Sequence, residues 1–224
     1  MRYLFIISFL LFFSCKKDDE NNEITLAAGY LYTFTLEFEN FWNAEEFPNE
    51  YPENAVWGNF TGLTHRDDNN ILLQDNTKAS AEIASYAQTN DNTTLAQEIL
   101  FLTSNTYNHI DVPAGEAFKK SFTFNFQTTA DNPHITVVAK MIPSPDWFIV
   151  IRNINLNVLG LGGRINYFVP VYDMGVDSGE SYIASGNTTE SPISIKENYP
   201  LVNSNGQYEH IGIVTISYKT REEI

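Results

Sequence analysis

The sequence predicts an all-β fold, an antiparallel β-sandwich with short inserted helices, and three observations support this prediction. The segment Tyr30–Phe38 alternates large apolar residues with mostly polar ones, the period-two pattern of a half-buried strand. The segment Phe118–Gln127 shows the same alternation, with phenylalanine at every second position from Phe122. Aromatic residues make up 14% of the chain, so there is enough large apolar surface to build a core. Several such strands with Gly, Pro and Asn between them indicate a sandwich.

Other segments complete the predicted domain. Further strands are expected at Ile135–Ile142, Trp147–Arg152, Ile154–Val158, Ile165–Tyr172 and Tyr208–Tyr218. Helical spacing of apolar residues instead predicts short helices at Lys78–Gln88 and Thr93–Phe101, the second capped by Thr93. No Gly/Ser linker and no internal repeat divides this part of the chain, so we expect one domain over residues 30–220.

The charge and cysteine content exclude several functions. The 224 residues include 13 basic and 28 acidic side chains, a net charge of −15. Such a chain would repel a phosphate backbone, so nucleic acid is not an expected partner. A single cysteine can form neither an internal disulfide nor a zinc cluster, whereas the acidic surplus is compatible with a hard cation.

The N-terminus predicts export and lipid attachment. Residues 1–14 have a basic start followed by an apolar run too short to span a bilayer, which is typical of a signal peptide. The stretch Leu11–Cys15 resembles a bacterial lipobox, so we expect cleavage before Cys15 and acylation of its thiol, with residues 15–29 as a flexible tether to the membrane. An ordinary signal region with a free or buried cysteine is the alternative.

The residues after Cys15 bear on location. Lys16 and Lys17 are followed by acidic residues, which resembles the export signal of surface lipoproteins in Bacteroidetes. We therefore expect an outer membrane lipoprotein that is exposed on the cell surface. A tether that faces the periplasm, with charges that only keep it soluble, is the alternative.

The sequence does not predict an enzyme. A serine nucleophile would need a strained turn and an assignable base, and neither is present. The four histidines, His65, His109, His134 and His210, are scattered without metal-ligand spacing. No nucleophile, base and orienting group can be assigned together.

Three aspartates are the candidate metal ligands. Asp146 precedes a predicted strand, and Asp173 and Asp177 follow another, in a loop where Gly175 and Gly179 permit backbone angles closed to other residues. If the strand ends meet, these carboxylates together with loop carbonyls could bind a hard cation such as Ca²⁺. Aspartates in such loops also commonly form Asx-turns with their own backbone, and spacing alone does not decide between the two interpretations.

Two motifs carry a family resemblance. The stretches Pro143–Phe148 and Asp173–Gly179 resemble the two most specific motifs of the spondin N-terminal (F-spondin) domain. Further elements follow in the family's order: Phe41-Trp42-Asn43 with Phe47-Pro48, Gly62-Leu63-Thr64-His65, and Ile211-Gly212-Ile213-Val214-Thr215. The resemblance covers most of residues 30–218.

This resemblance implies a sandwich similar to calcium-dependent membrane-binding sandwiches, with a metal ion bound by loops at one end. It implies that Asp146, Asp173 and Asp177 are the ligands and that Trp147 is a core anchor. Known relatives are non-catalytic extracellular matrix and adhesion proteins. The chain departs from them at Gly160-Leu161-Gly162, where the family has Gly-x-Trp, and it lacks their disulfides and thrombospondin-type repeats, so their partners do not carry over.

Together these observations predict a surface-anchored, calcium-binding, non-catalytic adhesion or recognition module. Its expected partners are the membrane, through Cys15, and a protein or glycan ligand that the sequence does not identify. The alternative is a structural or assembly subunit that docks onto an outer-membrane protein complex.

Overall fold

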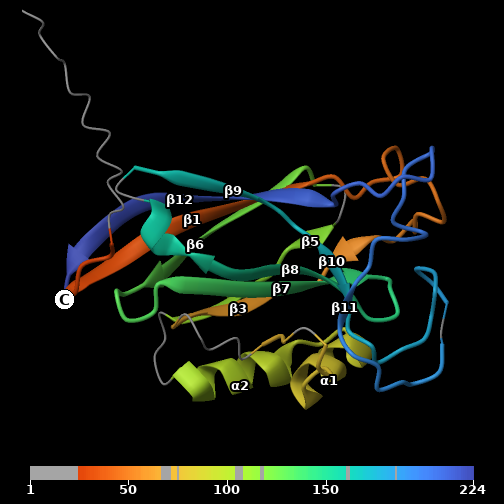
Figure 1. Ribbon diagram of the computed structural model, residues 1–224, viewed down its shortest axis with the longest axis horizontal. Helices are drawn as coiled ribbons and strands as arrows, with labels where there is room; N and C mark the ends of the chain where they lie inside the picture. The colour runs from red at the N-terminus through yellow and green to blue at the C-terminus, as the bar shows by residue number, and fades with distance from the viewer. Residues whose placement is uncertain are drawn as a thin grey trace, which may run out of the picture.

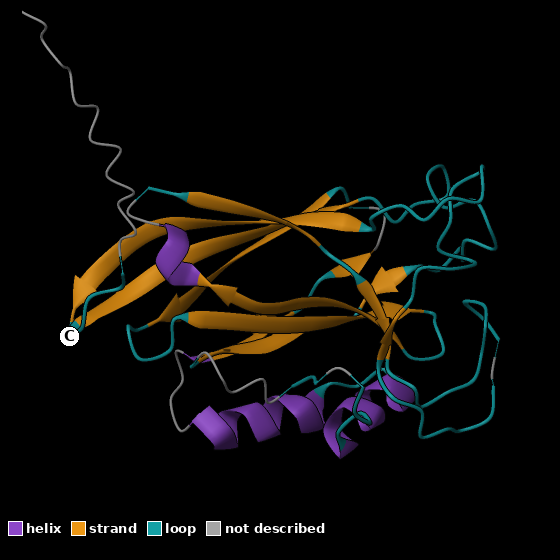
Figure 2. Ribbon diagram, viewed as in Figure 1, coloured by secondary structure: helices purple, strands orange, loops and turns teal. Residues whose placement is uncertain are grey.

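The computed structural model describes residues 25–66, 72–74, 76–103, 108–116, 119–159, 162–184 and 186–224. The predicted signal peptide and Cys15 lie outside these residues, as does most of the tether. Two antiparallel sheets pack face to face, with two helices beneath the larger sheet (Figures 1 and 2). The predicted all-β sandwich with short helices is confirmed.

The smaller sheet has four strands in the order β6 (Ser121–Thr128), β1 (Tyr30–Asn40), β12 (Gly212–Glu223) and β9 (Arg164–Phe168). The larger sheet has eight strands. Its main path runs through β11 (Ser194–Ile195), β10 (Val171–Asp173), β8 (Trp147–Asn155), β7 (His134–Ile142), β2 (Val56–Trp57) and β5 (Gly115–Glu116). β3 (Phe60–His65) also pairs with β7, and β4 (His109–Val112) pairs with β3.

The main core lies between the two sheets. Alternate residues of β1, among them Phe34 and Phe38, are fully buried. The register of β1 with β6 places Phe34 opposite Phe126 and Phe38 opposite Phe122, and both ring pairs are stacked. The period-two alternation seen in the sequence therefore forms a continuous aromatic layer.

A second core explains why the central strands of the larger sheet are apolar on both faces. In β8, Trp147, Ile149 and Ile151 face the smaller sheet, whereas Phe148 and Val150 face the helices. α1 (Ala81–Thr89) and α2 (Thr93–Thr103) cover that second face. Within the described part of the chain, no helix has the length and apolar character needed to cross a bilayer.

The helix ends differ in detail from the prediction. α1 begins at Ala81, because the Ser80 side chain accepts a hydrogen bond from the Ile83 amide as an N-cap, and it ends at Asn90 in the left-handed conformation. Thr93 is the first residue of α2 and not its cap: its amide donates to the Asp91 carboxylate (2.9 Å).

Several strand predictions are corrected. The expected strand Ile165–Tyr172 is two strands, β9 and β10, which belong to different sheets because Pro170 interrupts the pairing between them. β8 runs on to Asn155, and the expected strand Ile154–Val158 ends in the 3₁₀ helix Leu156–Leu159. β12 begins at Gly212, later than expected. The strands β2 to β5 and β11 were not anticipated.

The chain enters the fold at one end of the sandwich, and Asp146 lies at the other. The Leu26 amide donates to the side chain of Asn157, which follows the end of β8 (2.9 Å). Asp146 immediately precedes the start of the same strand, so a nine-residue strand of roughly 27 Å separates the two positions. The loops at the Asp146 end are on the right in Figure 1, and the entry is on the left.

The aromatic core gives the first prediction. Phe38→Ala should lower the free energy of unfolding by about 3–5 kcal/mol, because the ring is fully buried against Trp57, Phe60 and Phe122. Urea denaturation followed by tryptophan fluorescence measures the change. Phe101→Ala is the matched control, since the Phe101 side chain is 80% exposed on α2 and its loss should change stability by less than about 0.5 kcal/mol. Equal effects of the two variants would contradict the assigned core.

Candidate functional site

A tight hairpin between β7 and β8 places Asp146. The Ser144 hydroxyl donates to the Met141 carbonyl (2.6 Å) and accepts from the Trp147 amide (3.1 Å), which closes the turn on itself. Trp147 then starts β8 and is fully buried in the main core. Its predicted role as a core anchor is confirmed, and it fixes the neighbouring Asp146 relative to the sheet.

Asp146 is fully buried and binds the backbone of the loop that follows β10. Its Oδ2 accepts hydrogen bonds from the amides of Val176 (2.7 Å) and Asp177 (3.1 Å), and its backbone carbonyl accepts from the Met174 amide (3.2 Å). Its other carboxylate oxygen, Oδ1, is buried without a hydrogen-bond partner. A buried carboxylate with one unpaired oxygen is unfavourable on its own, which points to a missing partner.

Asp173 and Asp177 each turn the chain with their own side chain. The Oδ1 of Asp173 accepts from the Gly175 amide (2.8 Å), and the Oδ1 of Asp177 accepts from the amides of Gly179 (2.7 Å) and Gly186 (2.8 Å). Both are therefore Asx-turns, the alternative that the sequence left open. Asp173 is the last residue of β10 and is paired with Trp147 of β8, so it lies beside the Asp146 hairpin. The structure thus brings the three predicted aspartates to one end of the larger sheet.

The two glycines of this loop act differently. Gly175 has φ of +70°, and a Cβ there would collide with the backbone oxygen of Ser191. Gly179 does not have a positive φ, contrary to the expectation from sequence, but a Cβ there would collide with the Ala184 carbonyl. Gly175 is needed for its conformation and Gly179 for close backbone approach.

Two buried lysines accompany the buried aspartate. Histidines apart, the charged side chains that the structure buries within its described residues are Lys140, Asp146 and Lys196. The Lys140 ammonium donates to the Ala87 carbonyl and to the Asn90 side chain (2.6 Å) at the end of α1. The Lys196 ammonium donates to Asn198 Oδ1 (2.7 Å) and the Tyr199 carbonyl (3.0 Å) and lies 4.6 Å from the centroid of the Trp147 ring.

These groups perturb one another electrostatically. Burial raises the pKa of Asp146 to about 6, and the charge of Asp173 adds to this, whereas the amides of Val176 and Asp177 oppose it. Burial also raises the pKa of Asp173, against the effects of the Gly175 amide and the Lys196 charge. The Trp147 indole lowers the pKa of Asp173 as well, although its Nε1 forms no hydrogen bond of regular geometry.

The lysines respond in the opposite direction. Burial lowers the pKa of Lys140 to about 8, although the charges of Asp146 and Asp177 favour its protonated form. Burial likewise lowers the pKa of Lys196, against the charges of Asp173, Glu180 and Asp146. Lys196 and Lys140 line two different pockets, both of which Asp177 also lines, and the ammonium groups partly neutralise the carboxylates.

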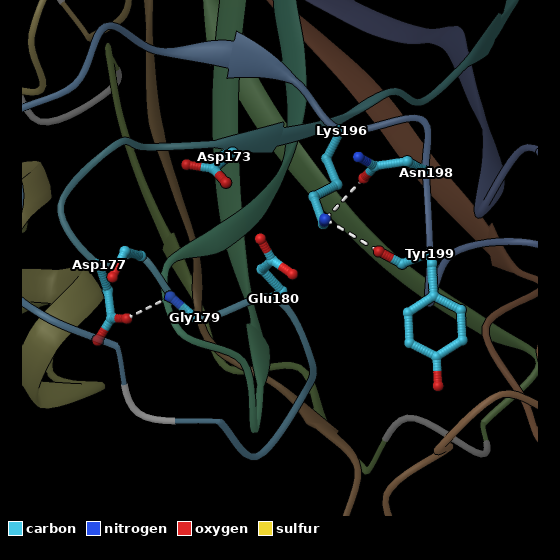
Figure 3. A pocket seen from close by; sticks show the side chains of 8 residues that line it. Asp173, Asp177, Gly179, Glu180, Lys196, Asn198 and Tyr199 are labelled. Carbon is cyan, nitrogen blue, oxygen red and sulfur yellow. Dashed lines mark hydrogen bonds between the residues drawn. The ribbon is translucent and has the colours of Figure 1, made fainter.

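A polar pocket of about 360 Å³ opens on this site. Its lining includes three acidic side chains, Asp173, Asp177 and Glu180, and the ammonium of Lys196. Figure 3 shows the carboxylates of Asp173 and Glu180 turned into the pocket together with the Lys196 side chain, while the Asp177 carboxylate is turned to Gly179. The pocket therefore has an excess of negative charge.

The oxygen atoms at this site are of the kind that a hard cation prefers. Carboxylate and carbonyl oxygens are the ligands that Ca²⁺ prefers, and the unpaired Oδ1 of Asp146 is a buried oxygen that a cation would satisfy. In the described part of the chain, however, no three His, Cys, Asp or Glu side chains are gathered into a ready-made metal cluster. The site therefore has suitable oxygen ligands, but the aspartate side chains that carry them are hydrogen-bonded to backbone amides.

The long loop beside the pocket is fixed to the rest of the domain by Tyr182. This side chain is 1% exposed, its hydroxyl accepts a hydrogen bond from the Trp42 indole (3.2 Å), and its ring packs against Trp147. Trp42 follows the end of β1, so the loop is held between the two sheets. The motif residues Trp42 and Trp147, far apart in the sequence, thus meet around one tyrosine.

Sequence reasoning missed both lysines. Lys140 had a signal, because a single charge inside the apolar run Ile135–Ile142 needs a buried partner. Lys196 had none: its position follows from the pairing of the short strand β11 with β10, which aligns Ser194 with Asp173. The departure at Gly160-Leu161-Gly162 lies partly outside the described residues.

The loop geometry gives the second prediction. Gly175→Ala should destabilise the protein by about 1–3 kcal/mol more than Gly206→Ala, because only the first adds a steric collision to the strain of a positive φ. Gly206 is the matched control, since its φ is +75° and nothing lies within 4 Å of the added Cβ. Thermal unfolding of both variants measures the difference, and similar losses would contradict the close packing of Gly175 on Ser191.

Comparison with known proteins shows the family of the chain. The profile of the spondin N-terminal family (Spondin_N) matches residues 32–210, which include the three aspartates and Trp42. Rat (Rattus norvegicus) Spondin-2 is 26% identical over 71% of this chain, and the match covers 50% of the rat protein. The chain thus spans about half the length of this relative. Because the family profile matches most of its length, the chain belongs to the spondin N-terminal family.

Proposed function

We propose that this protein is a membrane-tethered, non-catalytic recognition module whose contact loops are organised by calcium. Its ligand would be a protein or a glycan that approaches the loop end of the sandwich. Asp146, Asp173 and Asp177 would hold the cation, and loop carbonyls would complete its shell of oxygen ligands.

One observation carries this proposal. Asp146 is completely buried, and its Oδ1 has no hydrogen-bond partner, although its Oδ2 binds two amides. Asp173 and Asp177 approach it on the same loop, and the charge of each raises its pKa. A divalent cation would satisfy the unpaired oxygen and offset the repulsion among the three carboxylates.

When bound, calcium would supply electrostatic cross-linking between two loops that are distant in the sequence. Asp146 belongs to the β7–β8 hairpin, Asp173 is the last residue of β10, and Asp177 belongs to the loop that follows. The hairpin and the loop already share three hydrogen bonds through Asp146. The chain's own residues therefore preposition the loops, and the cation would stiffen their contact.

The position of the site fits a tethered module. The described chain enters at the end of the sandwich opposite to Asp146, and the ten residue-to-residue steps from Cys15 to Thr25 can span at most about 35 Å. A lipid on Cys15 would keep the entry end near the membrane and leave the pocket end pointing outwards. No nucleophile, base and orienting group are assigned at the site, so the proposal does not include catalysis.

The third prediction concerns calcium. A calcium concentration about 100-fold above the dissociation constant should add about 2.7 kcal/mol of stability, which corresponds to a rise in Tm of roughly 5–10 °C for a domain of this size. Asp173→Asn should remove this rise, because it deletes the charge but keeps an oxygen that can accept from the Gly175 amide. Differential scanning calorimetry in calcium and in chelator measures both.

Asp131→Asn is the control for the calcium experiment. Asp131 is exposed in the turn between β6 and β7, at the end of the sandwich where the chain enters, so this variant should keep the full calcium response. Identical melting curves of the unaltered protein in calcium and in chelator would remove the metal from the proposal.

The fourth prediction concerns the tether. Cys15→Ser should move the protein from the membrane fraction to the soluble fraction, because the serine hydroxyl does not replace the acylated thiol. Cell fractionation followed by immunoblotting measures the change. In intact cells the unaltered protein should be cleaved by added protease. Membrane retention of Cys15→Ser would contradict the lipid anchor, and protection from protease would contradict surface exposure.

A further inference from the structure

The pocket contains a positive charge that the family motifs do not account for. Lys196 lines the same pocket as Asp173, Asp177 and Glu180, and the residue as a whole is only 8% exposed. A lysine charge that is largely removed from water is unfavourable unless it is paired and hydrogen-bonded. Two of its hydrogen bonds go to Asn198 and the Tyr199 carbonyl, which are neutral groups and leave its charge to be balanced elsewhere.

Two of the candidate cation ligands, Asp173 and Asp177, line the same pocket as Lys196. Asp173, Glu180 and Asp146 each act electrostatically on Lys196, and Lys196 in turn acts on Asp173. The Trp147 ring lies 4.6 Å from the ammonium and presents a π-face to it, so the ring helps to hold the ammonium in the pocket that Asp173 also lines. Figure 3 shows it on the wall of the pocket across from Asp177.

We propose that Lys196 is a specificity-determining residue, a resident counter-ion that weakens the binding of a divalent cation at Asp146, Asp173 and Asp177. This inference rests on the proposed function. A bound divalent cation and the Lys196 ammonium neutralise the same carboxylates and repel each other. The lysine therefore stabilises the pocket without metal and raises the calcium concentration at which the site fills.

The second lysine does not have this role. The Lys140 ammonium donates its hydrogen bonds to Ala87 and Asn90 at the end of α1, and the residue lines a different pocket on the helix side of the sheet. Its loss would leave a carbonyl and an amide oxygen without their donor, so its effect on calcium could not be separated from an effect on the fold. The effect of a buried lysine charge on calcium binding is therefore tested at Lys196.

The experiment compares Lys196→Met with the unaltered protein in calcium titrations by isothermal calorimetry and in thermal melts with chelator. Methionine keeps an unbranched chain over Trp147 but removes the charge. Calcium affinity should rise about tenfold or more, since a unit positive charge is removed from the same partly desolvated pocket as the divalent ion. In chelator the Tm should fall, because the carboxylates lose their counter-ion, and calcium should restore it.

Three further variants isolate the charge. Lys196→Arg keeps the charge and should keep the original affinity. Lys196→Gln keeps a hydrogen-bond donor near Asn198, is more polar than methionine, and should behave as Lys196→Met even if that variant folds poorly. Lys78→Met removes an exposed lysine that pairs with Glu190 (2.5 Å) near the same loop, and it should change neither the calcium affinity nor the chelated Tm.

Each outcome decides between the two proposals. If the unaltered protein binds calcium and Lys196→Met binds it more tightly, both stand. If only the neutral Lys196 variants bind calcium, the counter-ion role stands and the proposed calcium-organised function of the unaltered protein fails. If the unaltered protein binds and the neutral variants bind equally or more weakly, the counter-ion role is overturned alone. If none of them binds, both are overturned.

Discussion

The arrangement of the loop end depends on the burial of one carboxylate. Asp146 joins the β7–β8 hairpin to the loop after β10 by accepting hydrogen bonds from two successive amides, and it does so in a site closed to water. A charge in such a site must be compensated nearby, so the two lysines and the amides of Val176 and Asp177 can be understood as responses to it. A surface carboxylate in the same turn would impose none of these constraints.

The two cores supply the rigid frame for this site. Trp147 belongs to the core between the sheets, while Phe148, the next residue, belongs to the core beneath the helices. The strand that carries Asp146 is therefore fixed from both faces. The same double coverage holds Lys140, whose side chain leaves β7 on the helix side and ends at the last turn of α1. The helices thus contribute to the electrostatics of the loop end as well as to packing.

The sequence predicted the elements that have a local pattern. β1 begins at Tyr30 as expected, because its alternation reflects one buried and one more exposed face. β3 was missed because all six of its residues are buried, so no alternation remains, and it contains Gly62. The sequence predicted β9 and β10 as one strand. The chain passes from one sheet to the other at Pro170, and this change depends on which strands pair with β9 and with β10, which is a tertiary property. The family motifs supplied the three aspartates, while Lys196 depended on pairing between β10 and β11.

The Tyr182 contact has a consequence for the proposed recognition of a ligand. This side chain lies in the middle of the longest loop beside the pocket, and it is inserted between Trp42 and Trp147. Loops that fold only when they meet a partner lose conformational entropy at that moment, and their affinity is reduced accordingly. Here the buried Tyr182 ring fixes the middle of the loop in the folded domain, so a ligand of the proposed kind would meet a surface whose shape exists before binding.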